Sequence, residues 1–211
     1  MAAALKTKQI IFLLIAVALL AIGWGVWTHH NTHLSSKPSF ESATIFPQPR
    51  RVPDFQLIDS NNQPLTLNNL KGHWSLLFFG FTRCPELCPT TLAVLKQAYK
   101  NLAAAHQTVV PQMVFISVDP ESDSLARIRD YVHSFNPAFL GATGSAQTLS
   151  QLTESFSVLY MKVKSAQADG DYTIDHSGTI LIVNPQGQFA GVFTLPHDAN
   201  KISHDIQTLM G

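Results

Sequence analysis

A continuous apolar run from Trp74 to Phe81 is followed almost at once by Cys84 and Cys88, the two cysteines of the chain. A strand with one face in water would alternate apolar and polar residues, so this run is typical of a strand buried on both faces. Residues 90–105 then carry apolar side chains at helical spacing. The pattern predicts that both sulfurs lie where a buried strand gives way to a helix.

The chain on either side of this junction also alternates between strand and helix patterns. A hairpin with a polar turn is expected over residues 55–67, ahead of the junction. After it, we expect strands over 113–118, 180–183 and 188–193, and helices over 125–135, 149–156 and 202–210. This alternation indicates an α/β fold, in which helices cover both faces of a sheet.

An apolar stretch of 18 residues, from Ile10 to Trp27, precedes the folded part of the chain. At about 1.5 Å per residue, its length is close to the minimum for a helix that spans a bilayer. A cleaved signal peptide is the alternative, but no convincing small-x-small cleavage site follows the stretch. Trp24 and Trp27 suit a membrane interface, and Lys6 and Lys8 favour a cytoplasmic N-terminus.

These features divide the chain into four expected parts. They are a short cytoplasmic N-terminus at 1–9, a transmembrane anchor at 10–27, a polar linker with several prolines at 28–49, and a folded domain at 50–211. The segment before the anchor is too short for a transit peptide, so a bacterial inner membrane fits better than a mitochondrion. The domain would then lie in the periplasm, an oxidising compartment in which a disulfide is chemically reasonable.

The charge balance excludes one class of partner. The chain has 14 basic and 14 acidic residues, and no basic run is interleaved with aromatic residues. Proteins that bind nucleic acid through its phosphates need an excess of positive charge on one face. We therefore expect no nucleic-acid partner.

The two cysteines leave three roles open: a redox dithiol, a metal site or a structural crosslink. Residues four apart in a helical turn are neighbours, roughly 5–6 Å apart at Cβ, and a helix N-terminus favours thiolate over thiol. The usual redox motif has two residues between its cysteines, whereas three separate Cys84 from Cys88. Two thiolates suit Cu(I) with one further ligand, whereas Zn(II) takes four ligands. A crosslink over so short a loop would constrain little of the unfolded chain.

The best candidate for a third ligand is His176, which we expect in a loop just before the strand at 180–183. Loops at the carboxyl edge of an α/β sheet converge, and ligand sites gather there. On this pattern alone, a solvated surface histidine remains the alternative. The other histidines lie in the linker, in turns or in helices without a comparable context: His29, His30, His33, His73, His106, His133, His197 and His204.

Three segments, in order, resemble the signature blocks of the Sco/SenC family. They are Gly-Phe-Thr-Arg-Cys-Pro-Glu-Leu-Cys-Pro-Thr-Thr-Leu at 80–92, Ile-Ser-Val-Asp-Pro-Glu-Ser-Asp at 116–123, and Tyr-Thr-Ile-Asp-His-Ser at 172–177 followed by Asn-Pro-Gln-Gly at 184–187. The resemblance covers about residues 50–210 and the anchor. It implies a thioredoxin-like fold, with a central mixed sheet, flanking helices and an N-terminal hairpin.

The resemblance also implies a metal site and a partner. By position, Cys84, Cys88 and His176 would be the ligands of a copper ion, held as Cu(I), with Cu(II) left open. Family members assist assembly of the dinuclear copper site in subunit II of cytochrome c oxidase. That subunit, or another copper or thiol protein, is the implied partner, together with the inner membrane.

Two carboxylates of the family blocks are candidates for a supporting role. Asp119 and Asp175 are candidates for orienting the imidazole of His176 or for docking a partner. For Asp119 the alternative is that it only ends a strand before Pro120. The chain departs from the family pattern without losing a ligand, at Glu86, Leu181 and Asn184.

Two functions stay open at this point. The first is a membrane-anchored copper chaperone, which passes Cu(I) by ligand exchange to the cysteines of its partner. The second is an enzyme, a thiol–disulfide oxidoreductase that reduces those cysteines and needs Cys84 and Cys88 but not His176. A peroxidase is disfavoured, because Phe81 stands where such enzymes have threonine or serine. The spacing of the cysteines favours the chaperone.

Overall fold

The computed structural model describes residues 13–27, 39–106, 109–164 and 172–210. The chain forms two compact units, Met1–Ser39 and Phe40–Gly211. Three expected segments lie outside the described residues: the N-terminal segment 1–9, the first part of the anchor at 10–12, and residues 28–38 of the linker.

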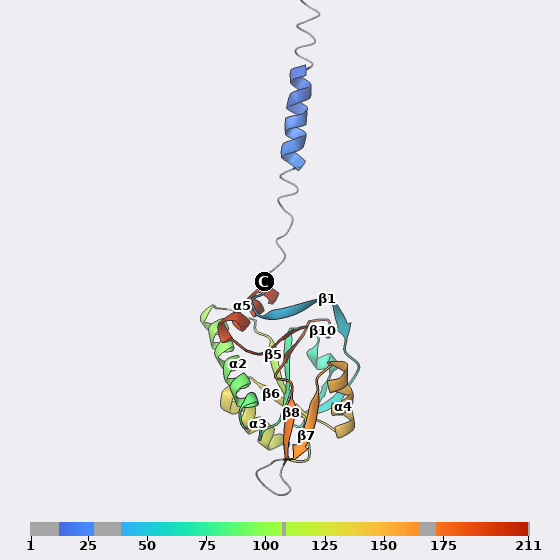
Figure 1. Ribbon diagram of the computed structural model, residues 1–211, viewed down its shortest axis with the longest axis vertical. Coiled ribbons are helices and arrows are strands. Elements are labelled where there is room, and N and C mark those ends of the chain that lie inside the picture. The colour runs from blue at the N-terminus through green and yellow to red at the C-terminus, as the bar shows by residue number, and fades with distance from the viewer. Residues whose placement is uncertain (1–12, 28–38, 107–108, 165–171, 211) are drawn as a thin grey trace, which may run out of the picture. The chain divides into compact units, whose positions relative to one another are not determined.

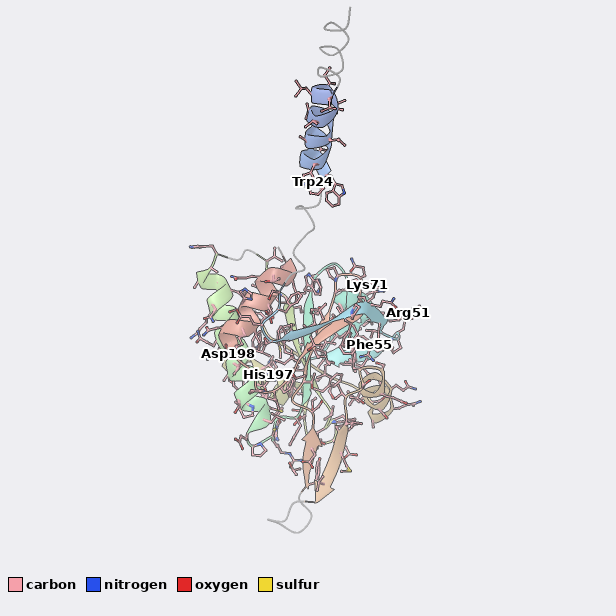
Figure 2. The ribbon with its side chains drawn as sticks, turned by 45° about the horizontal axis from the view of Figure 1, so that its top comes forward. Trp24, Arg51, Phe55, Lys71, His197 and Asp198 are labelled. Carbon is pink, nitrogen blue, oxygen red and sulfur yellow. The ribbon has the colours of Figure 1, made fainter. Side chains whose placement is uncertain are left out.

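The described part of the first unit is one helix over residues 13–27. Its apolar side chains are exposed along its whole length, and Trp24 lies near its end (Figure 2). The rings of Trp24 and Trp27 are 5.7 Å apart. None of the helices in the described ranges has both the length and the apolar character needed to cross a bilayer.

The second unit is built on a mixed eight-stranded sheet (Figure 1). In spatial order its strands are β1 (Ala43–Arg51), β10 (Gln188–Phe193), β9 (Ile180–Val183), β4 (Ser75–Gly80), β5 (Gln112–Ser117), β6 (Leu140–Thr143), β2 (Gln56–Asp59) and β3 (Pro64–Thr66). The strands β4, β5 and β6 are parallel, and the other pairs are antiparallel. The cysteine-bearing loop leaves β4, in the middle of the sheet.

Helices cover both faces of this sheet, as the sequence predicts. The helices α2 (Leu87–Ala104), α3 (Leu125–Phe135) and α5 (Ala199–Met210) pack on one face, and α4 (Ala146–Ser155) with the short 3-10 helix η1 (Leu67–Leu70) on the other (Figure 1). Within β4, Leu76 and Phe78 belong to the first apolar layer, and Leu77 and Phe79 to the second. Burial of alternate side chains in opposite layers explains why the run from Trp74 to Phe81 has no polar alternation.

A separate two-stranded sheet carries the third block of the sequence. It consists of β7 (Tyr160–Lys164) and β8 (Tyr172–His176), which pair antiparallel, with Tyr160 opposite residue 176. Ile174 of β8 is buried in the apolar layer that also holds α4. The hairpin is therefore packed on the domain and does not extend into solvent as an isolated arm.

The structure corrects the expected boundary of the linker. Residues 43–49, assigned to the linker by their prolines, belong to β1 at the edge of the sheet. This strand pairs with β10 only over residues 43–45 and 50–51, so Pro47 and Pro49 fall where the register is broken. Proline is tolerated at such an edge because no ladder hydrogen bond is required from it there.

The start of β1 is fixed by a buried carboxylate on α5. Asp205 accepts hydrogen bonds from the backbone N–H groups of Glu41, Ser42 and Ala43 at 2.7–2.8 Å. Burial raises the pKa of Asp205, but these three hydrogen bonds outweigh it, and the pKa lies below its ordinary value. The carboxylate is therefore ionised at neutral pH and holds the chain where it enters the domain.

The remaining elements confirm most of the sequence assignments. The N-terminal hairpin is β2 and β3, the predicted strands are β5, β9 and β10, and α3 spans the predicted residues 125–135. The strand β6 and the β7–β8 hairpin were not predicted. All three are short strands of four or five residues.

Candidate metal centre

The two cysteines lie in the turn that joins β4 to α2. Cys84 lies in the loop, where its N–H donates to the carbonyl of Phe81 at 3.2 Å, and Cys88 lies in the first turn of α2. The N–H of Cys88 donates to Sγ of Cys84 at 3.3 Å. Neither residue is in a disulfide, so the crosslink considered from the sequence is not formed. Cys88 is buried and Cys84 is half-buried, so the pair is open to solvent on the side of Cys84.

The environment of Cys88 differs from the expectation that a helix N-terminus makes both sulfurs acidic. A hydrogen bond with the Cys84 side chain, together with burial, raises the pKa of Cys88 far above its ordinary value. These effects outweigh the favourable helix terminus. In the metal-free reduced protein Cys88 is therefore a thiol, and its proton must leave before the sulfur binds a metal.

Close packing behind Cys88 depends on a glycine at the end of β4. A Cβ added to Gly80 would lie 2.5 Å from Sγ of Cys88 and 2.9 Å from Cε2 of Phe115. A glycine is therefore required here if the Cys88 sulfur is to lie directly against the strand.

A second carboxylate, not identified from the sequence as a site residue, fastens the cysteine loop. Asp123 is buried and accepts hydrogen bonds from the N–H of Thr82 at 2.9 Å, the hydroxyl of Thr82 at 2.5 Å and the hydroxyl of Ser117 at 2.6 Å. It thereby joins the loop before Cys84 to the end of β5. The sequence signal was the presence of hydroxyl residues at the ends of two neighbouring buried strands.

Asp119 lies at the centre of a polar cluster beside the cysteine loop. Its carboxylate, fully buried, accepts from the hydroxyl of Tyr172 at 2.7 and 2.8 Å and from Nη2 of Arg83 at 3.2 Å, and Nζ of Lys162 lies 3.6 Å away. Burial raises the pKa of Asp119, but the hydrogen bonds from Tyr172 and Arg83 and the charge of Lys162 bring it below its ordinary value. Asp119 therefore does more than end a strand, because it joins the cysteine loop to both strands of the β7–β8 hairpin.

Residue 176 is the last residue of β8, and not part of a loop as the sequence suggested. Its side chain lies outside the described part of the structure. The residues that follow it adjoin the cysteine turn: a Cβ added to Gly178 would lie 3.0 Å from Cδ1 of Leu87, the residue before Cys88. Ser177 donates its N–H to the carbonyl of Leu159 at 3.3 Å. The backbone therefore brings the segment after residue 176 to the first turn of α2.

The other candidate residue of the third block, Asp175, is exposed and lies opposite Met161 in the hairpin. Among the side chains that the structure describes, no three of His, Cys, Asp or Glu are grouped closely enough to hold a metal ion. The two described thiols supply part of a ligand set, and the carboxylates of Asp119 and Asp123 are engaged in hydrogen bonds.

A histidine that the sequence left as a surface residue lies beside the segment after residue 176. His197, between β10 and α5 (Figure 2), donates from Nε2 to the carbonyl of Gly178 at 2.6 Å. Because the carbonyl can only accept, Nε2 carries the proton, and the buried Nδ1 has no partner within the described residues. Burial lowers the pKa of His197, which keeps its ring neutral.

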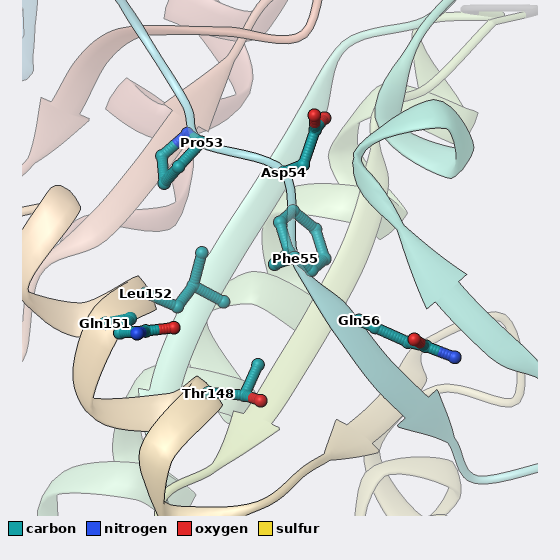
Figure 3. Close-up of a pocket in the computed structure, with 7 residues that line it drawn as sticks. All are labelled: Pro53, Asp54, Phe55, Gln56, Thr148, Gln151 and Leu152. Carbon is teal, nitrogen blue, oxygen red and sulfur yellow. The ribbon is translucent and has the colours of Figure 1, made fainter.

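One of the hollows on the surface of the domain adjoins the cysteines. A shallow hollow of about 270 Å³ lies over the start of α2, lined by Glu86, Leu87 and Thr90. A hollow of about 580 Å³ lies between α4 and the segment that enters β2, and has no thiol or imidazole in its wall (Figure 3). The residues that line it are Pro53, Asp54, Phe55, Gln56, Thr148, Gln151 and Leu152.

Comparison with known proteins identifies the family. The SCO1/SenC family model matches residues 45–211. The chain is 34% identical to a putative copper-binding protein of Stutzerimonas stutzeri over 152 residues, which are 72% of this chain and 73% of the relative. It is 30% identical to an SCO2-like protein of Rickettsia typhi over 196 residues, which are 92% of this chain and 96% of the relative.

A solved structure shares the arrangement of elements. The copper-bound ScoI of Arabidopsis thaliana is 33% identical, with a TM-score of 0.69 over 75% of this chain and 97% of that one. The mixed sheet with flanking helices therefore matches a Sco structure, as the thioredoxin-like assignment predicts. By its fold, its cysteine turn and its match over residues 45–211, the chain belongs to the SCO1/SenC family.

Proposed function

We propose that this protein is a copper chaperone, which binds Cu(I) through Cys84, Cys88 and His176 and delivers it to another protein. The observation that carries the proposal is the cysteine turn itself. Neither cysteine is in a disulfide, and the two lie close together, with the N–H of Cys88 donating to Sγ of Cys84. The copper named for the Stutzerimonas stutzeri relative and for the Arabidopsis thaliana structure supports the same ion.

The chemistry of the donor set favours Cu(I) over harder ions. Thiolate sulfur is soft and suits Cu(I), and an imidazole nitrogen completes a low-coordinate site. Residue 176 is two positions after Ile174, which is buried, and four after Tyr172, which contacts Asp119. Because side chains alternate along a strand, position 176 belongs to the face of β8 that lies on the domain. This placement supports His176 as the third ligand.

Delivery by ligand exchange needs access from one side. Cys84 is half-buried while Cys88 is buried, so an incoming thiolate meets the copper on the side of Cys84. It bonds to the copper as one of the original ligands leaves, without a change in oxidation state. The family resemblance makes the dinuclear copper site in subunit II of cytochrome c oxidase the proposed acceptor.

A second function uses the same thiols. As a thiol–disulfide oxidoreductase, the protein would form a Cys84–Cys88 disulfide while a disulfide of the partner is reduced, with transfer of two electrons and two protons. Two observations support this alternative: neither cysteine is in a disulfide, and the pKa of Cys88 is raised in the metal-free state. It does not require His176.

We also propose that the chain is anchored in a bacterial inner membrane, with its domain in the periplasm. The apolar stretch at 10–27, flanked by Lys6 and Lys8 and ending in Trp24 and Trp27, supports this proposal. Alkaline extraction of membranes, followed by protease treatment of spheroplasts, tests it. Release of the full-length chain by alkali would contradict the anchor, and resistance of the domain to protease would contradict the orientation.

The metal site is tested with the reduced full-length chain, loaded with Cu(I) without oxygen in competition with a Cu(I) chelator. We expect wild type and His133→Ala, an exposed histidine of α3, to retain a single copper ion against the chelator. We expect His176→Ala to lose it or hold it far more weakly. Equal retention by His176→Ala would remove His176 as a ligand and favour the oxidoreductase.

A further inference from the structure

The polar cluster around Asp119 joins three segments that are far apart in the sequence. Arg83 comes from the cysteine loop, Lys162 from β7 and Tyr172 from β8, and Ser122 follows Asp119 in its own turn. The cluster therefore lies between the turn that carries both thiols and the hairpin that ends in residue 176. None of its members is itself a thiol or an imidazole.

The direction of each hydrogen bond in this cluster follows from the groups that make it. Arginine can only donate and a carboxylate can only accept, so Tyr172 gives its single proton to Asp119. Ser122, whose oxygen lies 2.8 Å from that of Tyr172, must then donate to the tyrosine, while Nη2 of Arg83 donates to Ser122 at 3.1 Å. The chain of bonds runs from Arg83 through Ser122 and Tyr172 to Asp119. A hydrogen bond from Arg83 to Asp119 at 3.2 Å closes it into a ring.

The ring of Tyr172 adds a second set of contacts. The guanidinium of Arg83 lies 4.9 Å from its centroid and Nζ of Lys162 lies 4.6 Å from it. Both cations also approach the buried carboxylate of Asp119, and Nζ of Lys162 lies 2.6 Å from the carboxylate of Glu121, so two carboxylates balance the two cations. Such a network strengthens cooperatively when every member is satisfied, and loss of one member leaves buried polar groups without partners.

We propose that Tyr172 is a positioning residue of the copper site, whose hydroxyl, held by Asp119 and Ser122, fixes the β7–β8 hairpin against the cysteine loop. This inference rests on the proposed function and deepens it. Tyr172 lies on the same strand as residue 176, four positions before it, and is linked to Arg83, the residue next to Cys84. A hairpin fixed at Tyr172 presents residue 176 to the thiols, and a loosened hairpin releases it.

The proposal couples copper retention to the docking of the hairpin. If copper binds better when the hairpin is docked, bound copper must in turn stabilise docking, because the coupling between two linked equilibria is reciprocal. Removal of an interaction that orients a metal ligand typically weakens metal binding 10–100-fold. The proposal thus makes one prediction for copper and another for the backbone of the hairpin.

The test compares Tyr172→Phe with Thr173→Val in the full-length chain. The first variant removes the hydroxyl from the cluster and keeps the ring between the two cations. The second is a matched control at the next residue of β8. It removes a hydroxyl that makes no hydrogen bond within the described residues. Each is measured by Cu(I) competition with a chelator, and by amide hydrogen exchange of β7 and β8 with and without copper.

We expect Tyr172→Phe to weaken Cu(I) retention by about tenfold or more, and Thr173→Val to change it less than about twofold. In a His176→Ala background, Tyr172→Phe should have no further effect on retention, because its action passes through residue 176. In the metal-free chain, Tyr172→Phe should speed amide hydrogen exchange in β7 and β8 but not in β4 and β5. Copper should slow exchange in the hairpin of the wild type.

Three outcomes would overturn the proposal. Unchanged retention in Tyr172→Phe would show that the hydroxyl does not position the site. An equal loss of retention in the His176→Ala background would show that Tyr172 acts through the cysteine loop or through global stability. A wild type that holds no Cu(I), or holds it equally well without His176, would instead overturn the proposed function, and this inference with it.

Discussion

The N–H of Cys88 donates to Sγ of Cys84 at 3.3 Å, so the two cysteines are joined by a hydrogen bond before any metal is present. The relation is not symmetrical. Cys84 accepts a backbone hydrogen bond at a half-exposed position, whereas Cys88 is buried, and its pKa is raised by its side-chain hydrogen bond with Cys84 and by burial. In this turn the sulfur of Cys84 is therefore accessible to solvent or to a partner, whereas the sulfur of Cys88 is shielded from both.

This asymmetry predicts selective alkylation. When the reduced, metal-free chain is treated with iodoacetamide at neutral pH, Cys84 should react first, because only the thiolate is nucleophilic and Cys88 is a buried thiol. Each unit of pKa lowers the thiolate fraction about tenfold, so the difference in rate should exceed tenfold. Peptide mapping by mass spectrometry gives both rates. In Cys84→Ser, Cys88 should still react more slowly than Cys84 does in Cys88→Ser, and similar rates in the two variants would contradict the asymmetry.

Gly80→Ala should disturb the site from the strand side. The new methyl group would lie 2.5 Å from Sγ of Cys88 and 2.9 Å from the Phe115 ring, so one of them must move. Overpacking of this kind usually costs about 1–3 kcal/mol. Chemical unfolding measures the loss, and faster alkylation of Cys88 should accompany it. Gly23→Ala is the control, since a Cβ there meets nothing within 4 Å, and an equal effect of the two would contradict the explanation.

The sequence predicted the centre of the fold because that part is encoded locally. The run from Trp74 to Phe81 packs against an apolar layer on each face of the sheet, and for this reason its residues are uniformly apolar. The position of the cysteines at the strand-to-helix junction followed from the same run. The edge strand β1 was not predicted, because Pro47 and Pro49 are typical of a linker. A strand tolerates them here because it lies at the edge of the sheet and its register is broken at these residues.

The cluster around Asp119 shows what local patterns do not contain. Its links to Arg83 and Tyr172 join residues 36 and 53 positions apart, and nothing in the spacing of these residues predicts that they meet. The sequence marked Asp119 and His176 through the family blocks, but gave Tyr172 and His197 no role. Both act through neighbours that only the folded hairpin and the turn before α5 provide.

Thr82→Val should loosen the cysteine loop without touching a sulfur. The substitution removes the hydroxyl that donates to Asp123 and leaves the backbone N–H of residue 82 in place. Loss of one hydrogen bond to a buried carboxylate should lower the free energy of unfolding by about 1.5–3 kcal/mol. Thr90→Val, at an exposed position in the first turn of α2, is the matched control. Denaturant unfolding of both variants is the measurement. Equal stabilities would show that the hydrogen bond from Thr82 to Asp123 does not stabilise the cysteine loop.

Asp205→Asn should destabilise the domain in a way that depends on pH. The pKa of Asp205 in the folded protein lies below its ordinary value of about 3.9, because burial, which raises it, is outweighed by the hydrogen bonds from Glu41, Ala43 and Ser42. A carboxylate with a lowered folded pKa contributes its full stabilisation above the unfolded pKa, and loses it as pH falls through the folded pKa. The variant should therefore be less stable than the wild type at neutral pH, by about 2–3 kcal/mol.

The difference between wild type and Asp205→Asn should then shrink as the pH is lowered below about 4, because protonation removes from the wild type the charge that the variant already lacks. Denaturant unfolding at a series of pH values measures it. Asp130→Asn, at an exposed position of α3 where the carboxylate forms a surface ion pair with Arg129, should show little difference at any pH. A difference for Asp205→Asn that stays constant down to pH values well below 4 would mean that the carboxylate charge is not what holds the start of β1.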